Sequence, residues 1–281
     1  MKQRMITVAC GVTALIIVLL FYKTMVLNVG VALISILAVH EIFGAAGISK
    51  SKALIACCYI YAAVLPFSYY CKFSGTGILL TFALLLALFS VMLKEHETVR
   101  VESMALCFMV TVLITASLTG LIFIRDNLVS SRIKDLPVFY IALAFIGSWI
   151  TDGGGYIFGT LMGKHKLSPK ISPKKTIEGA VGGIVSAVVF SVLFLFGYGA
   201  YLQFSGITAN YNYLSVIILA LACAAVSIIG DLSASIIKRQ NNIKDYGTIL
   251  PGHGGILDRF DSMLFVVPLI IVWMKLFPIV F

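Results

Sequence analysis

The sequence predicts an all-α, polytopic membrane protein with about nine transmembrane helices and a cytoplasmic N-terminus. Three observations support this prediction. The 281 residues are 60% hydrophobic and only 12% charged, whereas soluble domains carry about 25% charged residues. The mean hydropathy is +1.04. The apolar residues also form runs long enough to cross a bilayer, which takes about 20 residues of helix. So few charges could not cover the surface of a soluble protein of this length.

Nine apolar segments are candidate spans. The second closes early at His40 and Glu41, and the sixth is interrupted by Asp152 and three glycines. The first follows Lys2 and Arg4 without a small-residue cleavage site, so we expect an uncleaved span and not a signal peptide. The segments cover residues 5–22, 26–42, 53–71, 77–93, 104–124, 137–162, 179–202, 214–237 and 263–281.

The basic residues predict the orientation. A cytoplasmic N-terminus places fifteen of the 21 Lys and Arg residues on the inner side of the membrane, as the positive-inside rule requires. The loop at 203–213 carries no charge, which suits the outer side. We therefore expect a multi-pass protein of the cell (inner) membrane. Nucleic acid is excluded as a partner, because the basic residues lie in short loops between apolar spans.

The two halves of the chain differ in where their acidic residues lie. Before residue 136 these residues lie in or beside loops, Glu41 among them. After it, Asp152 and Asp231 fall inside apolar segments, and Glu178 begins one. An ionisable group inside a membrane is costly and indicates function. We therefore predict N-terminal transmembrane helices over 1–135 and a C-terminal catalytic transmembrane domain over 136–281.

Glycines recur at four-residue spacing in the second half. Gly155, Gly159 and Gly163 stack on one helix face, and Gly179 and Gly183 repeat the spacing. Small residues at this spacing let two helices approach closely. We expect close helix packing here, not ligand contact.

One motif reads S-P-K-K-T-I-E-G. Pro173 disfavours helix just before it, and Thr176 can cap the following helix with Glu178 in its first turn. Free amides at a helix start suit a phosphate, and Lys174 and Lys175 add positive charge. The alternative is an ordinary basic loop before a well-capped helix.

A second motif gathers carboxylates. On a helix, Asp231, Ser235 and Lys238 share one face, and Asp258 and Asp261 share a face at the start of the last span. Carboxylates near basic residues suggest Mg²⁺ holding phosphates, since Mg²⁺ is usually bound by one or two carboxylates plus substrate phosphates. Zinc is disfavoured, because no Cys lies nearby and the region's histidine stands alone. The competing interpretation is structural, with Asp258 paired to the arginine that follows it.

The stretch that begins at Ser235 reads S-x-I-K-R-x-x-x-x-K-D-x-G-x-x-L-P-x-H-G-G-I-x-D-R-F-D and ends at Asp261. It resembles the signature of the bacterial phosphatidate cytidylyltransferase (CDP-diacylglycerol synthase) family. The S-P-K-K-T-I-E-G block and Asp152 resemble that family too, so the resemblance covers roughly residues 150–262. Ile177 stands where the family usually has Trp.

The resemblance implies the reaction of CTP with phosphatidic acid at a lipid bilayer, giving CDP-diacylglycerol and pyrophosphate. It implies Mg²⁺ at the three carboxylates of Asp231, Asp258 and Asp261, and it suggests a second cation such as K⁺. Asp152 is expected to orient a basic residue or a water molecule. The phosphates of both substrates are expected to contact Lys174, Lys175, Lys238, Arg239 and Lys244, with Lys175 counted as catalytic. The expected polar positioning residues are Ser172, Thr176, Ser235 and His253.

Two alternatives stay open at this point. A CTP-using polyprenol kinase would share parts of the motif but would release CDP and a lipid phosphate. An ion-coupled transporter would use intramembrane acids without turning over CTP, although the sequence shows no inverted repeat of the kind common in such proteins. The sequence leaves the oligomeric state open, a homodimer included.

Overall fold

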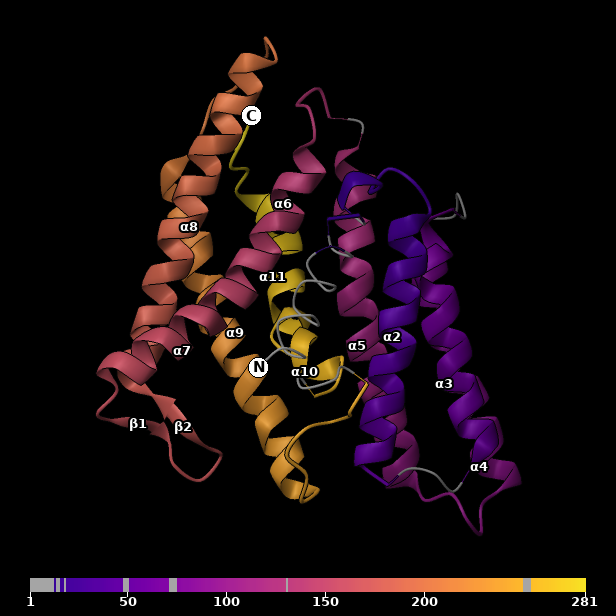
Figure 1. Cartoon of the computed structure of the whole chain (residues 1–281). Helices are drawn as coiled ribbons and strands as arrows, with labels where there is room; N and C mark the ends of the chain where they lie inside the picture. Colours follow the sequence, from indigo (N-terminus) through magenta and orange to yellow (C-terminus); the bar gives the residue numbers. More distant parts are fainter. Residues whose placement is uncertain are drawn as a thin grey trace. The chain divides into compact units, whose positions relative to one another are not determined.

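The computed structural model describes residues 13, 16–17, 19–47, 51–70, 75–129, 131–249 and 254–281. The described chain is helical apart from one small two-stranded sheet (Figure 1), in line with the predicted all-α class. It divides into two compact units. The first combines Met1–Phe123 with Gln240–Phe260, and the second combines Ile124–Arg239 with Asp261–Phe281. Part of the signature therefore packs with the N-terminal half of the chain.

Polar side chains tie neighbouring helices of the first unit together. Asn28 Nδ2 donates to the carbonyl of Pro66 at 2.6 Å, and the hydroxyls of Tyr61 and Thr81 lie 2.8 Å apart. Buried polar groups need such partners, so these contacts fix the helix register. The elements of this unit are α2 (Val26–Ala45), α3 (Lys52–Val64), η1 (Leu65–Tyr70), α4 (Thr76–Lys94), most of α5 (Val101–Leu128) and α10 (Leu257–Phe260).

Aromatic packing fills the core of the second unit. Phe139 of α6 stacks on Phe194 and Tyr198 of α8, with ring centroids 5.7 and 4.8 Å apart. Trp273 of α11 donates to the Ser215 hydroxyl of α9 at 3.0 Å. The elements of this unit are α6 (Leu136–Phe145), the π-helical segment η2 (Ile146–Ile150), α7 (Thr151–Met162), β1 (Lys166–Ser168), β2 (Ser172–Thr176), α8 (Ile177–Phe204), α9 (Tyr213–Gln240) and α11 (Met263–Leu276).

Six helices in the described part of the chain are long and apolar enough to cross a membrane, so the protein is a multi-pass membrane protein. Of the other predicted spans, more than half of the first falls outside the described residues, the third forms the shorter helix Lys52–Ser68, and the ninth contains the 14-residue α11. Nine spans and the orientation therefore stay predictions. The six helices are Val26–Ala45, Thr76–Lys94, Val101–Leu128, Leu136–Met162, Ile177–Phe204 and Tyr213–Gln240.

The expected early end of the second span is wrong. Helix α2 runs through His40 and Glu41 to Ala45, and Glu41 is only 3% exposed instead of lying in or beside a loop. Its carboxylate accepts hydrogen bonds from two backbone amides of the first unit. Such bonds compensate the loss of water around a buried charge. Glu41 can therefore be buried within the helix and does not have to end it.

The sixth predicted span is continuous. No break occurs at Asp152 or the glycines after it; instead, the π-helical segment η2 joins α6 to α7 just before Asp152. Such π-helical turns are rare in proteins as a whole, but those that occur are often found at functional sites. The predicted close packing of glycines is confirmed between α7 and α8, since a Cβ on Gly183 would lie 2.5 Å from the Thr151 carbonyl.

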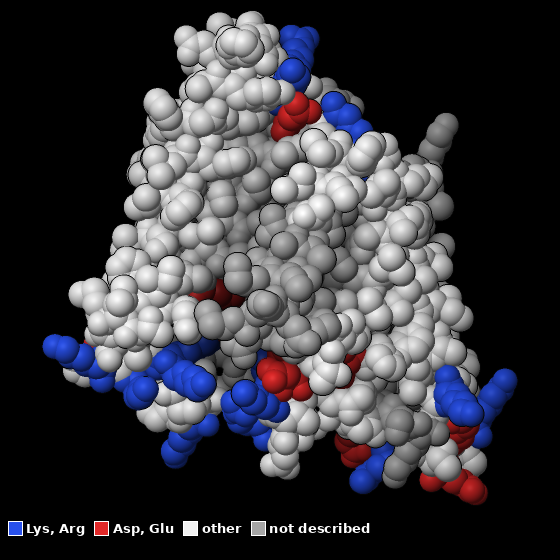
Figure 2. All heavy atoms as spheres, in the orientation of Figure 1, with Lys and Arg blue, Asp and Glu red and all other residues white. Residues whose placement is uncertain are grey.

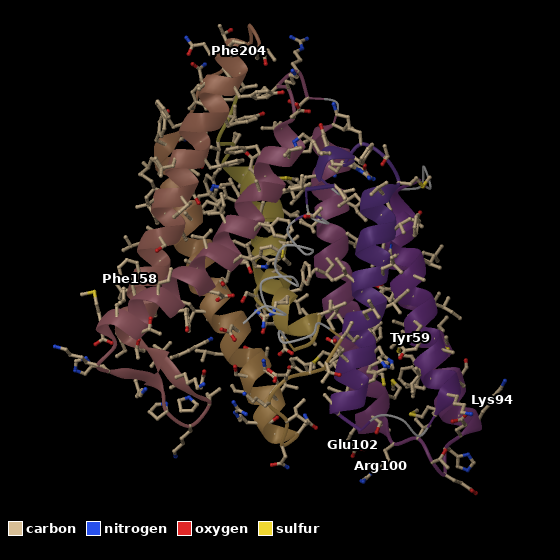
Figure 3. The ribbon with its side chains drawn as sticks, in the orientation of Figure 1. Tyr59, Lys94, Arg100, Glu102, Phe158 and Phe204 are labelled. Atoms are coloured by element: carbon tan, nitrogen blue, oxygen red, sulfur yellow. The ribbon has the colours of Figure 1, made fainter. Side chains whose placement is uncertain are left out.

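Many of the charged side chains lie at the ends of the helices. Figure 3 labels Lys94, Arg100 and Glu102 at the end where α4 leads into α5. Arg100 and Glu102 form an exposed ion pair there at 3.5 Å. In the second unit, blue atoms of Lys and Arg gather at the β1 and β2 end, while the visible sides of α7 and α8 are white (Figure 2). This pattern is typical of helices whose sides face lipid.

Candidate active site

The site in the second unit is built around helix α9. Asp231, Ser235 and Lys238 lie on this regular helix, as predicted, and so share one face. Gly230 allows a close approach next to them, because a Cβ at this position would lie 3.2 Å from the Asp261 carbonyl oxygen and 2.8 Å from the Phe265 ring. The absence of a side chain at Gly230 therefore brings the turn at Asp261 against α9.

Negative charge accumulates at this turn. Asp261 is 6% exposed, and the Ser262 hydroxyl lies 3.3 Å from Asp261 Oδ1 and 3.2 Å from Asp152 Oδ2. Burial, followed by the charges of Asp231 and Asp152, raises the pKa of Asp261 to about 7, and Lys238 opposes the shift. Carboxylates gathered in this way favour a bound cation.

The lysine pair lies on a strand, whereas the sequence predicted a loop. β2 pairs antiparallel with β1, with Lys166 opposite Thr176. Neighbouring residues of a strand point to opposite faces. Lys175 forms an ion pair with Asp231 of α9, while Lys174 is exposed.

The hairpin is anchored at both ends. At its base, Glu178 accepts hydrogen bonds from the backbone amides of Lys164 and His165, at 3.1 and 3.2 Å. At its tip, the Arg239 side chain of α9 donates to the Ile171 carbonyl at 3.4 Å. These contacts hold β2 along the same helix that carries Asp231.

The predicted cap of α8 is confirmed. Thr176 precedes the helix in an extended conformation, and its hydroxyl oxygen accepts a hydrogen bond from the Gly179 amide at 3.1 Å. Glu178 lies in the first turn, as expected. Thr176 is buried and Ser172 is half-buried on β2. The cap fixes where the strand ends and the helix begins.

Asp258 belongs to the first unit, where it organises a loop. Its Oδ2 accepts hydrogen bonds from the amides of Tyr246 and Gly255, at 2.9 and 3.0 Å. The prediction that Asp258 and Asp261 share one helix face is wrong, because α10 ends at Phe260 and Asp261 lies in the turn after it.

Two more predicted residues belong to this unit. Lys244 is exposed, and His253 lies outside the described residues. The predicted roles of Asp258, Lys244 and His253 stay predictions.

The donor set of the second unit suits Mg²⁺. Among the described residues, no group of three or more His, Cys, Asp or Glu side chains is placed to hold a metal ion by itself. Mg²⁺ usually takes one or two carboxylates and completes its shell with substrate phosphates and water. The oxygen donors of Asp231 and Asp261 fit that requirement, so the phosphates of a nucleotide would have to supply the rest.

Sequence reasoning missed two residues. Ser262 links the carboxylates of Asp152 and Asp261, and its only signal in the sequence is its position next to Asp261. Glu41 contacts the backbone around residue 256 across 215 positions of sequence. An acid inside an otherwise apolar span was the signal that could have found it.

The comparisons with known proteins identify the family of this chain. The model of the cytidylyltransferase family matches residues 2–277. Phosphatidate cytidylyltransferases of Staphylococcus haemolyticus, Staphylococcus epidermidis and Staphylococcus aureus are 40%, 46% and 38% identical to the chain over 131 residues. Each match covers 47% of this chain and 47% of the relative, so the aligned part spans about half the length of either protein. Because the family model covers nearly the whole chain, this protein belongs to the cytidylyltransferase family.

Proposed function

We propose that this protein is a phosphatidate cytidylyltransferase, which transfers CMP from CTP to phosphatidic acid and releases pyrophosphate. The observation that carries the proposal is the contact of Lys175 with Asp231, beside the buried Asp261. A cation for phosphates thus lies next to carboxylates for a metal, in a chain of the cytidylyltransferase family. The names of the staphylococcal relatives support the same reaction.

The reaction is a substitution at phosphorus. An oxygen of the lipid phosphate bonds to the α-phosphorus of CTP, and the bond from that phosphorus to the bridging oxygen of the β-phosphate breaks. Phosphate monoesters lose their second proton near pH 6, so the lipid needs no strong base. The difficulty is to bring two anions together, which requires positioning and positive charge.

We assign the charge to groups of the second unit. Lys175 and Lys238 are proposed to hold the triphosphate. Arg239 of α9 and the exposed Lys174 of β2 are proposed to make weaker contacts with it from the edge of the site. Mg²⁺ bound to Asp231 and Asp261 would neutralise charge on the phosphates and orient the α-phosphate. The amide and hydroxyl of Ser262 would keep the Asp261 carboxylate in place beside Asp152. Asp258 and Lys244, in the first unit, remain proposed ligands of metal and phosphate.

Two radiolabelled forms of CTP test the reaction. Purified protein in detergent would be incubated with phosphatidic acid, Mg²⁺ and CTP labelled at either the α- or the γ-phosphate. We expect the α-label to appear in the lipid and the γ-label in pyrophosphate. Transfer of the γ-label to a lipid would instead identify a kinase, and the absence of any CTP-dependent transfer would contradict both activities.

A further inference from the structure

Glu41 is a buried acid of the N-terminal half. It lies near the end of α2 and is buried, and its carboxylate contacts the loop that leads into α10. Oε1 accepts a hydrogen bond from the Ile256 amide at 2.9 Å, and Oε2 accepts one from the Leu257 amide at 2.8 Å. Hydrogen bonds to a charged acceptor are about twice as strong as those between neutral groups. One side chain therefore fixes two successive peptide groups.

Two glycines fit closely around the same carboxylate. A Cβ on Gly247 would lie 2.5 Å from Glu41 Oε1, and a Cβ on Gly255 would lie 2.5 Å from Glu41 Oε2. No side chain could be accommodated at that distance without moving the carboxylate or the backbone. The loop thus approaches Glu41 at two points eight residues apart in the chain.

Asp258 holds the same loop through the amide that precedes those of Ile256 and Leu257. Its Oδ2 accepts the hydrogen bond of the Gly255 amide at 3.0 Å, so the amides of three successive residues, 255, 256 and 257, all donate to carboxylates. Gly254 just before them has a φ of 83°, which only glycine adopts readily. The backbone direction into α10 is therefore set by Glu41 and Asp258 together.

We infer that Glu41 is a positioning residue for the transfer reaction: its carboxylate fixes the backbone of residues 255–257 and thereby orients Asp258. The inference rests on the proposed function, in which Asp258 helps to hold the metal. It assigns a role to the N-terminal half, since α2 lies more than two hundred positions before the signature loop. Glu41 itself contacts backbone, not substrate.

Exchange of backbone amides tests the contact directly. Glu41→Gln keeps the size of the side chain but turns an NH₂ group toward one of the two amides, which then loses its acceptor. We expect hydrogen exchange of the peptide containing Ile256 and Leu257 to become at least about tenfold faster. Ser35→Ala is the matched control, because Ser35 is a buried polar residue of the same helix whose hydroxyl has no hydrogen-bond partner among the described residues. Unchanged exchange in Glu41→Gln would overturn the inference.

Kinetics separate positioning from mere stability. Because Asp258 is proposed to hold the metal that acts on the reacting phosphates, Glu41→Gln should lower kcat about tenfold or more per folded molecule while the KM for CTP changes less than about threefold. Faster exchange with a normal kcat would show that Glu41 is only structural. If Glu41→Gln does not fold, Gly247→Ala crowds the same carboxylate and should give faster exchange with a smaller loss of kcat. A wild-type protein that transfers no CMP would refute the proposed function, and the exchange result would still decide whether Glu41 holds the loop.

Discussion

The Lys175 ammonium on β2 pairs with the Asp231 carboxylate on α9, although 56 positions separate the two residues in the chain. The two side chains are only 28% and 22% exposed, so the pair is largely shielded from water. In the proposed function, a nucleotide bound at this point would offer its phosphates to Lys175 while a metal ion takes Asp231. The pair is therefore where the proposal is tested most directly.

Lys175→Ala should raise the apparent KM for CTP roughly 10- to 150-fold. A hydrogen bond to a charged group contributes about 1.5–3 kcal/mol, and each 1.36 kcal/mol corresponds to a tenfold change. Steady-state kinetics with CTP as the varied substrate measure the effect. An unchanged KM with normal turnover would remove Lys175 from the site.

The adjacent Lys174 is the matched control for that substitution. It has the same chemistry but is exposed on the opposite face of β2. An exposed charge contributes about 0–1 kcal/mol, so Lys174→Ala should change the KM for CTP less than about fivefold. Equal effects of the two substitutions would contradict the strand geometry.

The class of the protein and much of its second unit could be predicted from sequence, because local rules govern them. Apolar runs specify the long helices, and a threonine followed by a glutamate specifies the start of α8. The spacing of Asp231, Ser235 and Lys238 follows from helix periodicity alone. The hairpin could not be predicted in this way, since a five-residue strand containing proline and two lysines has neither the composition nor the alternation of a typical strand.

Contacts between segments that are distant in the chain also could not be predicted from the sequence. The end of α10 at Phe260 breaks the helix that was expected to carry Asp258 and Asp261 together. The sequence predicts that a span ends at Glu41, because an acid is unfavourable inside it. The groups that stabilise this charge are backbone amides, which every residue but proline has, so the sequence does not reveal them. Such tertiary contacts override local preferences.

Glu178→Ala should loosen the hairpin. Its carboxylate accepts the amides of Lys164 and His165, and Lys175 depends on the hairpin for its position. We expect several-fold faster tryptic cleavage after Lys170, which is exposed in the hairpin turn, because cleavage follows local opening. The KM for CTP should rise, by less than in Lys175→Ala.

An exposed acid of the other unit provides the control. Glu102→Ala removes an ion pair with Arg100 at the surface, and such pairs contribute little. Neither cleavage after Lys170 nor the KM for CTP should change. A normal cleavage rate in Glu178→Ala would show that the hairpin is held by other contacts.

Single cysteines on either side of α8 test the predicted orientation. Lys170 and Thr208 are exposed, and the helix Ile177–Phe204 between them has 28 residues, which is about 42 Å at 1.5 Å per residue. In a background without native cysteines, a membrane-impermeant maleimide should label Thr208→Cys in intact cells. Lys170→Cys should react only after permeabilisation. The reverse pattern would overturn the orientation, and labelling of both from one side would show that α8 does not span.

Two of the predicted metal ligands, Asp258 and Asp261, should respond differently to replacement by asparagine. Asp258 holds two backbone amides of its loop, so Asp258→Asn should weaken the loop as well as the reaction. Asp261 instead lies near the charges of Asp231 and Asp152. Removing its charge relieves repulsion, so Asp261→Asn should keep or increase thermal stability in Mg²⁺-free buffer at pH 8. A melting curve of each variant measures this difference.

The metal proposal then depends on turnover per folded molecule. A bound metal ion stabilises charge in such transfers by several kcal/mol, so Asp231→Asn and Asp261→Asn should each lower kcat by about 100-fold or more. Raising the Mg²⁺ concentration should restore part of the activity of Asp261→Asn, because Asp231 and the nucleotide phosphates remain as ligands. If Asp261 has only a structural role, Asp261→Asn should instead have lower thermal stability and normal turnover. Wild-type turnover of Asp261→Asn at limiting Mg²⁺ would therefore exclude Asp261 from the metal site, even if the protein transfers CMP.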